Sequence, residues 1–303
     1  KRSVIQIANS TQLISLPRKW SQKYNIRKGD ELDVEEQGNK IIVQTESGLS
    51  NKEIIVDISG LTPRLADRFM ARAYQKGYDT ITLKYDDPEI AIAIQNKVNE
   101  LLGFEIMEQT KNTIIIKSIS QKLNIDFDSS LRRAFLIVLG MAEACLEAYK
   151  QGDKKTLENL YYKDFDVNKF CYFCLRYINK GFYGEFGTYI LYYLIEILED
   201  AGDEYKALAV HLAKVKTKKK SLIDVLSKVN ELTKIGYDFF YKPEKDKAVK
   251  SMNLYNQVRG EIQKLISTPD QAEAAALNSL DLIARIMYHF PTMRLDTLKG
   301  MGG

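Results

Sequence analysis

The spacing of apolar residues along the chain changes near residue 120. Before that point, apolar and polar residues alternate in short runs, which is typical of half-buried β-strands. After it, apolar residues recur every three or four positions, as at Leu131, Phe135 and Val138, which is typical of amphipathic helices. The sequence therefore predicts a multi-domain protein with a mixed α and β first part and an all-helical second part.

Residues 1–47 predict a small ββαββ domain. The run SVIQIANSTQLISL fits two strands joined by a polar turn, and Pro17 suits the first turn of the helix that follows. The alternating run ELDVEEQGNKIIVQ indicates a closing hairpin with Gly38 and Asn39 at its turn. Because about 45 residues bury little apolar surface alone, we expect this domain to pair with a second copy through interleaved, swapped hairpins.

Residues 50–120 predict a connecting domain with the order βαβαββ. Each of its two helices has a capping Thr or Asp, a proline at its first position and a terminal glycine. These residues are Thr62, Pro63 and Gly77 in one helix and Asp87, Pro88 and Gly103 in the other. We expect a small α/β sandwich of ferredoxin-like character. A glycine-rich phosphate loop is not among its motifs, so nucleotide binding has little support.

Residues 122–303 predict an all-α bundle. Breaks at glycines, prolines and charged runs divide it into about six helices, which suggests two consecutive three-helix repeats with a junction near 214–220. The junction is rich in lysine, at Lys214, Lys216, Lys218, Lys219 and Lys220. A solvated linker is the simplest interpretation of this run, and contact with DNA or an anionic ligand is the alternative.

Composition limits the class of protein. The 303 residues are 45% hydrophobic with a net charge of +4, which fits a folded protein and is too small a charge to indicate nucleic-acid binding by itself. No apolar run approaches the roughly 18 residues of a membrane span, so we expect a cytoplasmic protein that is not membrane-embedded. Cys171 and Cys174 form a lone C-x-x-C pair, which favours buried packing over a metal or redox site.

Charge is segregated near the amino terminus. From residue 1 to residue 28 there are seven basic residues and no acidic one, whereas acids cluster directly afterwards. The basic residues are Lys1, Arg2, Arg18, Lys19, Lys23, Arg27 and Lys28. Such side chains can neutralise DNA phosphates while a strand pair enters the major groove. A solvated basic face explains the same pattern, and the pattern alone does not separate the two.

Residues 1–44 resemble the AbrB-type swapped-hairpin domain, a DNA-binding module of bacterial and archaeal regulators and some antitoxins. The resemblance rests on the strand pair up to ISLPRKW, the helix RKWSQKYNI and the run RKGDELDV. It implies contacts to double-stranded DNA from basic residues at the first strand and the helix. The residues to which the resemblance assigns DNA binding are Lys1, Arg2, Arg18, Lys19 and Lys23. The family's glycine-rich first turn is replaced here by Asn9-Ser10-Thr11-Gln12, which leaves the bases read by this turn undefined.

The helical region contains a pattern of acidic residues. Glu199 and Asp203 are four residues apart, and Asp164 and Asn168 repeat that spacing in the preceding predicted helix. Side chains at this spacing share one helix face, so four oxygen-bearing groups can converge on a divalent cation if the helices pack side by side. An ordinary solvated helix face is the alternative, since Lys206 is nearby and no histidine joins the set.

Residues of about 122 to 290 resemble PhoU proteins, which regulate phosphate uptake. The run YLIEILEDAGDEYKALAVHLAK resembles the helix with the family's acidic E-x-x-x-D motif, and DFDVNKFCYFCLRYI resembles its partner helix. The resemblance implies two three-helix repeats and a cation, divalent or of iron or zinc type, at Glu199, Asp203, Asp164 and Asn168. Phosphate transporter or sensor kinase subunits are the partners it implies.

The chain departs from the PhoU pattern in both repeats. Asn168 stands where an acid is usual, and the second repeat offers Asp281 with Arg285, together with Asn253 and Asn256. Arg285 brings a positive charge to the place where a cation would bind. The second cation site is therefore expected to be lost and the first weakened.

Neither histidine suggests an active site. His211 and His289 lie at predicted helix ends without a partner that looks like a catalytic pair, so we expect no enzyme. The sequence predicts a DNA-binding transcriptional regulator of the phosphate response that forms a homodimer or a higher homo-oligomer. The alternative is a PhoU-like adaptor that acts on a transporter or sensor kinase by protein contact. An antitoxin fits less well, because antitoxins pair this domain with a short disordered tail.

Overall fold

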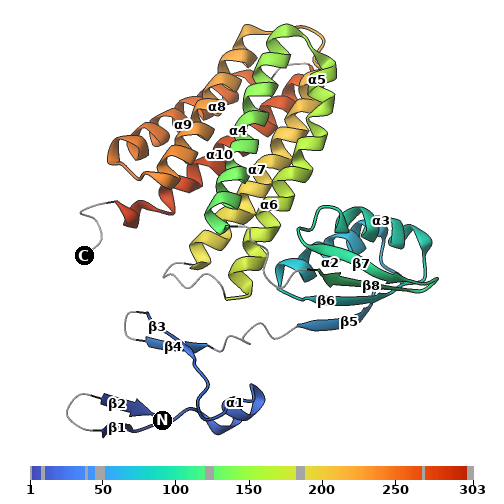
Figure 1. The fold of residues 1–303 in the computed structure, drawn as a ribbon. Coiled ribbons are helices and arrows are strands. Elements are labelled where there is room, and N and C mark those ends of the chain that lie inside the picture. Colours follow the sequence, from blue (N-terminus) through green and yellow to red (C-terminus); the bar gives the residue numbers. More distant parts are fainter. Residues whose placement is uncertain are drawn as a thin grey trace. The chain divides into compact units, whose positions relative to one another are not determined.

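A computed structural model describes most of the chain. The described residues are 2–7, 11–37, 40–44, 52–119, 126–181, 188–267 and 270–298. The chain divides into two compact units (Figure 1). The first is the amino-terminal segment up to Asn51, and the second contains the strands and helices from Lys52 onward.

The first unit has the predicted order ββαββ. It consists of β1 (Val4–Ile7), β2 (Thr11–Ile14), α1 (Arg18–Lys23), β3 (Asp33–Gln37) and β4 (Lys40–Gln44). The strands form two separate antiparallel pairs, with Val4 opposite Ile14 and Asp33 opposite Gln44. The predicted turn residues Asn9, Ser10, Gly38 and Asn39 lie outside the described residues.

Where the structure describes the exposure of side chains in this first unit, none of them is buried. Large apolar side chains of its strands are 44–67% exposed. They are Val4, Ile5, Ile7, Leu13, Ile14, Val34 and Ile41. The described part of one chain therefore provides these strands with no hydrophobic core.

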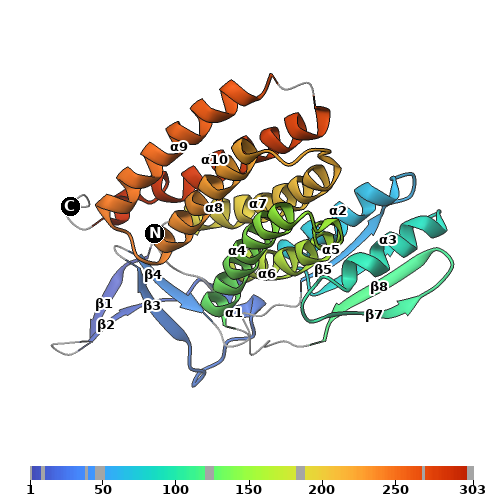
Figure 2. The same ribbon diagram turned by 90° about the horizontal axis from the view of Figure 1, so that it is seen from above.

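The second unit begins with a four-stranded sheet. Its elements are β5 (Glu53–Asp57), α2 (Pro63–Gln75), β6 (Thr80–Lys84), α3 (Pro88–Val98), β7 (Phe104–Gln109) and β8 (Thr113–Ser118). The strand order is β5-β6-β8-β7, with β5 and β6 parallel and the other pairs antiparallel. Figures 1 and 2 show α2 and α3 on the same face of this sheet, over a shared core.

The βαβαββ order was predicted, but its ferredoxin-like character was not correct. A ferredoxin-like sheet needs the order βαββαβ, in which the second helix follows two hairpin strands. Here each helix follows one strand, and the hairpin comes last. The predicted caps are present, because Thr62 Oγ1 accepts a hydrogen bond from Leu65 N and an Asp87 carboxylate oxygen accepts one from Glu89 N.

The rest of the second unit is an all-α bundle. The described helices are α4 (Phe127–Gln151), α5 (Lys154–Asn159), α6 (Tyr161–Asn179), α7 (Thr188–Lys214), α8 (Lys220–Tyr241), α9 (Lys245–Leu265) and α10 (Gln271–Thr292), and a 3₁₀ turn follows at Leu295–Thr297. The two predicted groups of long helices, α4–α6–α7 and α8–α9–α10, share one hydrophobic core. The short helix α5 was not predicted; Asp153 starts it by accepting a hydrogen bond from Thr156 N.

Cys145, Cys171 and Cys174 are buried with free thiols, in agreement with the expected packing role. Burial raises the pKa of the Cys145 thiol to about 12, which keeps it protonated at neutral pH. In the part of the chain that the structure describes, no helix has both the length and the apolar character needed to cross a bilayer.

A buried ionic cluster joins the sheet layer to the bundle within the second unit. The Arg176 guanidinium of α6 donates to the carbonyl oxygens of Tyr74 and Tyr78, at 2.9 and 2.7 Å, and also pairs with Asp79. Lys180 pairs with the same carboxylate at 2.6 Å. Gly77 has a φ of +87°, and an added Cβ would lie 2.9 Å from Cγ of Lys180. These contacts hold α2 against α6, which positions the acidic site described below.

Candidate DNA-binding surface and acidic site

The predicted basic residues of α1 lie on an exposed surface. Arg18, Lys19 and Lys23 are exposed, and the described residues form no ion pair with them. Pro17 O accepts a hydrogen bond from Ser21 N at 2.9 Å, and Asn25, with a φ of 52°, follows the helix end. The helix is therefore a short platform whose charges are available to an anionic partner.

Arg2 lies beside the first hairpin. Its Nη1 donates to Ser15 Oγ at 3.3 Å, so its guanidinium lies next to the residue that follows β2. Lys1 lies outside the described residues. Arg27 and Lys28 are exposed as well, in a turn that Asp30 closes by accepting a hydrogen bond from Arg27 N at 2.7 Å. This turn adds two cations to the candidate surface without an acid that pairs with their side chains among the described residues.

The structure joins two of the four predicted acidic-site residues, Asp164 of α6 and Asp203 of α7, through Lys206, while Glu199 contacts Tyr172 and Asn168 is buried on α6. Lys206 Nζ donates to Asp164 Oδ2 at 2.6 Å and also to Asp203 Oδ1. Tyr172 OH, one turn beyond Asn168 on α6, donates to Glu199 Oε1 at 2.9 Å. Figure 1 shows α6 and α7 side by side.

Gly202 allows this close approach of the two helices. A Cβ at this position would lie 3.0 Å from Val167 Cγ1, so an alanine here would require Val167 to shift by a few tenths of an ångström. The i, i+4 spacing then places Asp164 and Asn168 opposite Glu199 and Asp203. The solvated-face alternative does not describe these groups, because Asp164, Asn168 and Glu199 are buried.

Burial shifts the titration of the acidic groups. It raises the pKa of Glu199 to about 7, and the charge of Asp203 adds to this shift, while the hydrogen bond from Tyr172 opposes it. Burial likewise raises the pKa of Asp164 to about 6, although the hydrogen bond from Lys206 opposes the change. The pKa of Lys206 is raised, because its hydrogen bonds to Asp164 and Asp203 outweigh the effect of burial. The ammonium therefore stays charged.

Helix α2 supplies further positive charge to the acidic face of α7. Arg72 forms an ion pair with Glu196, and the charges of Glu199 and Asp203 help to raise the pKa of Arg68 against the effect of burial. This contact was not predicted from the sequence. Its only local signal is that Arg68 and Arg72 share one face of α2 at i, i+4 spacing, as Glu196 and Asp200 do on α7.

The oxygen donors of this site meet only part of what a divalent cation needs. Asp164 Oδ1 and Asn168 Oδ1 are buried without a hydrogen-bond partner among the described residues. Buried oxygen atoms normally have a hydrogen-bond donor or a cation beside them, so these two could serve as ligands. However, a divalent cation on Asp164 Oδ1 would lie roughly 4 to 6 Å from the Lys206 ammonium, a repulsion of about 5–8 kcal/mol at an effective dielectric constant of 20. Among the described residues no group of three or more His, Cys, Asp or Glu side chains is placed to hold a metal ion, and this includes the acidic site. The site fits a metal only if Lys206 moves away.

The corresponding place in the second repeat also holds cationic side chains. Asp281 Oδ2 pairs with Arg285 Nη2 at 2.7 Å, as the sequence suggested, and Asp281 Oδ1 pairs with Arg259 Nε at 3.1 Å. Asn253 and Asn256 are exposed. Arg259 was not identified from the sequence, because it lies on α9 and reaches Asp281 only through the packing of α9 on α10.

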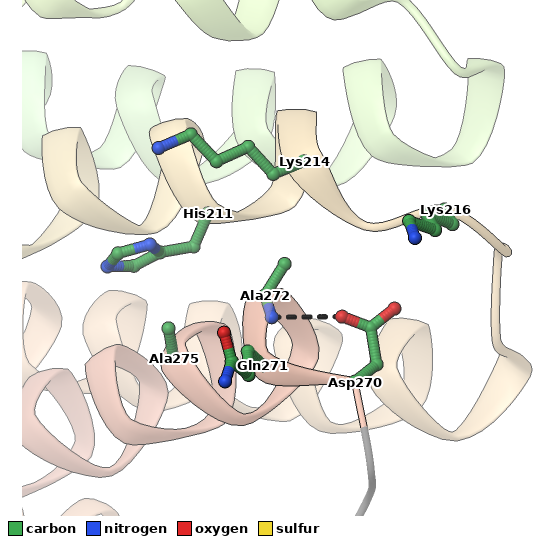
Figure 3. Close-up of a pocket in the computed structure, with 7 residues that line it drawn as sticks. All are labelled: His211, Lys214, Lys216, Asp270, Gln271, Ala272 and Ala275. Atoms are coloured by element: carbon green, nitrogen blue, oxygen red, sulfur yellow. Dashed lines mark hydrogen bonds between the residues drawn. The ribbon is translucent and has the colours of Figure 1, made fainter.

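A pocket of about 650 Å³ lies where the two repeats meet. Figure 3 shows His211 and Lys214 at the end of α7, Lys216 in the connection, and Asp270 and Gln271 at the start of α10. Asp270 is engaged as the helix cap, since its Oδ1 accepts hydrogen bonds from Ala272 N and Glu273 N. Burial and the charge of Lys214 lower the pKa of His211. The wall of this pocket thus carries two exposed lysines.

The lysine-rich junction is more than a solvated linker. Lys218 Nζ donates to Lys150 O at 2.6 Å, and Lys219 pairs with the buried carboxylate of Glu273. Two of the five junction lysines therefore connect the repeats through specific contacts.

The second histidine, His289, packs against an aromatic side chain. Its ring lies 6.0 Å from the ring of Tyr193.

Comparison with known proteins identifies one sequence family. Residues 5–48 match the family model for MazE, described as antidote–toxin recognition and as a bacterial antitoxin, which supports the expected AbrB-type domain. The matched family is regulatory. No curated protein matches the chain. Among solved structures, the phosphate transport system regulatory protein PhoU from Streptococcus pneumoniae aligns with a TM-score of 0.47 and 15% identity, over 56% of this chain and 92% of that chain.

Proposed function

We propose that this protein is a DNA-binding transcriptional regulator of the phosphate response. In this proposal the amino-terminal unit grips double-stranded DNA, and the helical bundle senses phosphate status or docks a partner. The observation that carries it is the exposed basic surface of α1 within a segment that matches an AbrB/MazE-type family model. Exposed Lys and Arg side chains supply the phosphate contacts on which most affinity for DNA depends.

Pairing of two chains is part of this proposal. The first unit exposes seven large apolar side chains on its strands, and no buried side chain is found among those of its residues whose exposure is described. Joining two copies through these strands would bury that surface and would place two copies of Arg18, Lys19 and Lys23 in one assembly. A two-fold DNA-binding surface of this kind matches a two-fold operator.

The bundle is proposed to alter DNA binding through its own ligand or partner. The resemblance of residues 122–290 to PhoU proteins supports a role in the phosphate response. The junction pocket, with Lys214 and Lys216 in its wall, offers the charge that an anionic effector needs. Binding there would favour one arrangement of the paired DNA-binding units over another.

Charge reversal on α1 tests DNA binding. The double variant Arg18→Glu/Lys19→Glu should lose retardation of genomic fragments that were crosslinked to the unaltered protein. Two acids in the first turn of α1 agree with the helix dipole, so the helix itself should persist. The slope of log affinity against log salt should fall by about 0.9 for every DNA phosphate that the variant no longer neutralises.

The matched control is Lys154→Glu/Lys155→Glu, which makes the same change of charge at exposed positions of α5. This control should bind DNA normally. Unchanged binding by the α1 variant would rule the proposal out. Sequencing the crosslinked DNA under phosphate plenty and under scarcity then tests the link to phosphate.

Two other functions are separated by different experiments. A PhoU-like adaptor would capture transporter or sensor kinase subunits in a pull-down and would retard no genomic fragment. An antitoxin, which the description of the matched family favours, would neutralise a toxin encoded beside it. Growth rescue of a toxin-expressing cell by this chain, with intact rescue by Arg18→Glu/Lys19→Glu, would favour that function over transcriptional control.

A further inference from the structure

The acidic face of α7 needs a source of positive charge. Asp164 and Asp203 share the Lys206 ammonium, the charge of Asp203 acts on Glu199, and Asp164 and Glu199 are 3% and 8% exposed. Carboxylates this close repel one another in a buried place unless a cation or protons neutralise them. The resemblance to PhoU proteins assigns that task to a metal, so the actual source of charge in this chain has to be identified from its contacts.

Lys206 already occupies the central position. Its Nζ is 2.6 Å from Asp164 Oδ2 and also donates to Asp203 Oδ1, so one ammonium bridges carboxylates from α6 and α7 as a metal would. The Lys206 side chain is 24% exposed and that of Asp164 only 4%. The side chain of Asp203 is 34% exposed, so it is the contact with Asp164 that lies away from solvent, where screening by salt is weak.

The second repeat shows the same arrangement with different residues. Asp281, in the corresponding motif, is held between Arg259 and Arg285. Two independent acidic positions thus pair with side-chain cations of the same chain. This repetition argues against an accidental contact of Lys206.

We propose that the chain supplies its own cations at both acidic positions, Lys206 in the first repeat and Arg259 with Arg285 in the second, in place of bound metal. Lys206 acts as a built-in cation that bridges α6 and α7. Loss of its side chain opens a site for a hard divalent cation, because the donors left behind are carboxylate and amide oxygens. Asp164 Oδ1 and Asn168 Oδ1, which have no partner among the described residues, would become ligands of that cation.

Mn²⁺ is the probe for this proposal, which does not depend on DNA binding. Isothermal titration with Mn²⁺ should give the same result for the unaltered full-length chain and for Asp203→Asn, because Asp203 binds no Mn²⁺ while Lys206 is present. Lys206→Ala should bind about one Mn²⁺ per chain, at least about tenfold more tightly than any residual Mn²⁺ binding elsewhere on the unaltered protein, since one competing positive charge has gone. Asp164→Asn in the Lys206→Ala background should abolish this new binding.

Lys228→Ala is the matched control, because Lys228 is a half-buried bundle lysine that pairs with a single carboxylate, Glu261. It should gain no affinity for Mn²⁺. Binding of Mn²⁺ by the unaltered chain that Asp203→Asn removes would overturn the proposal, as would a folded Lys206→Ala variant without affinity for Mn²⁺. If Lys206→Ala fails to fold, the titration of the unaltered chain and of Asp203→Asn decides the question.

Discussion

The two units of this protein solve the problem of burying apolar side chains in opposite ways. The second unit encloses two hydrophobic clusters, one under its sheet and one in its bundle, with residues such as Tyr74 and Phe290 fully buried. In the first unit no side chain of described exposure is buried, and β-branched side chains of its strands face solvent. The bundle thus buries its apolar side chains within one chain, whereas large apolar side chains of the strands before residue 45 remain exposed, which is the observation behind the proposed pairing of chains.

The largest effect is expected from a charge on the exposed strands of the first unit. Ile5 is 55% exposed and lies opposite Leu13. Ile5→Asp should weaken pairing of chains by on the order of 5 kcal/mol or more, because every dimer would carry two uncompensated charges at its interface. Sedimentation equilibrium over a range of concentrations measures this effect.

Val249→Asp is the control for that measurement. Val249 is 59% exposed on α9, close to the value for Ile5, so a single chain gives no reason for the two variants to differ. Only pairing through the strands predicts a selective loss with Ile5→Asp. Equal behaviour of the two variants would contradict the proposed pairing.

A core substitution in the second unit should have the next largest effect. Phe290 is fully buried, and its ring lies 5.3 Å from that of Phe135. Phe290→Ala should lower the free energy of unfolding of the bundle by about 3–5 kcal/mol, because it leaves a cavity. Calorimetry should show this change in the bundle transition, while retardation of DNA at low temperature stays intact. Loss of DNA binding at a temperature where the bundle is still folded would contradict the expectation that a core substitution in the second unit leaves DNA binding by the first unit unchanged.

A smaller effect concerns pH and the acidic site. The pKa of Glu199 is raised from its ordinary value of 4.5 to about 7, so the folded state holds its proton more tightly than the unfolded state between these values. The free energy of unfolding should therefore fall as pH rises across this window, by at most about 3 kcal/mol from this group.

Glu199→Gln should remove most of that fall, since a glutamine does not ionise and its amide oxygen still accepts the hydrogen bond from Tyr172. Denaturant unfolding from pH 4.5 to pH 8 measures the slope. Glu147→Gln, on the exposed part of α4, controls for the loss of a carboxylate. A slope that is the same in all three proteins would mean that Glu199 does not contribute to it.

Local signals in the sequence were sufficient to predict most of the strands and helices. Period-two and period-3.6 patterns located the strands and long helices, and the caps Thr62 and Asp87 fixed where helices begin. The spacing of Glu199 to Asp203 and of Asp164 to Asn168 was enough to predict that these groups share helix faces. Helix α5 was missed because its six residues are too few for a period to show.

Contacts between distant segments were decided only by the tertiary structure. The packing of the sheet layer on the bundle places Arg68 and Arg72 of α2 near the acidic face of α7. The same packing pairs Arg176 with Asp79. The sequence placed Lys206 near the acids but did not show that its ammonium lies between Asp164 and Asp203. The physical reason is that periodicity determines which face of a helix a residue occupies, whereas the choice of partner depends on packing among elements far apart in the chain.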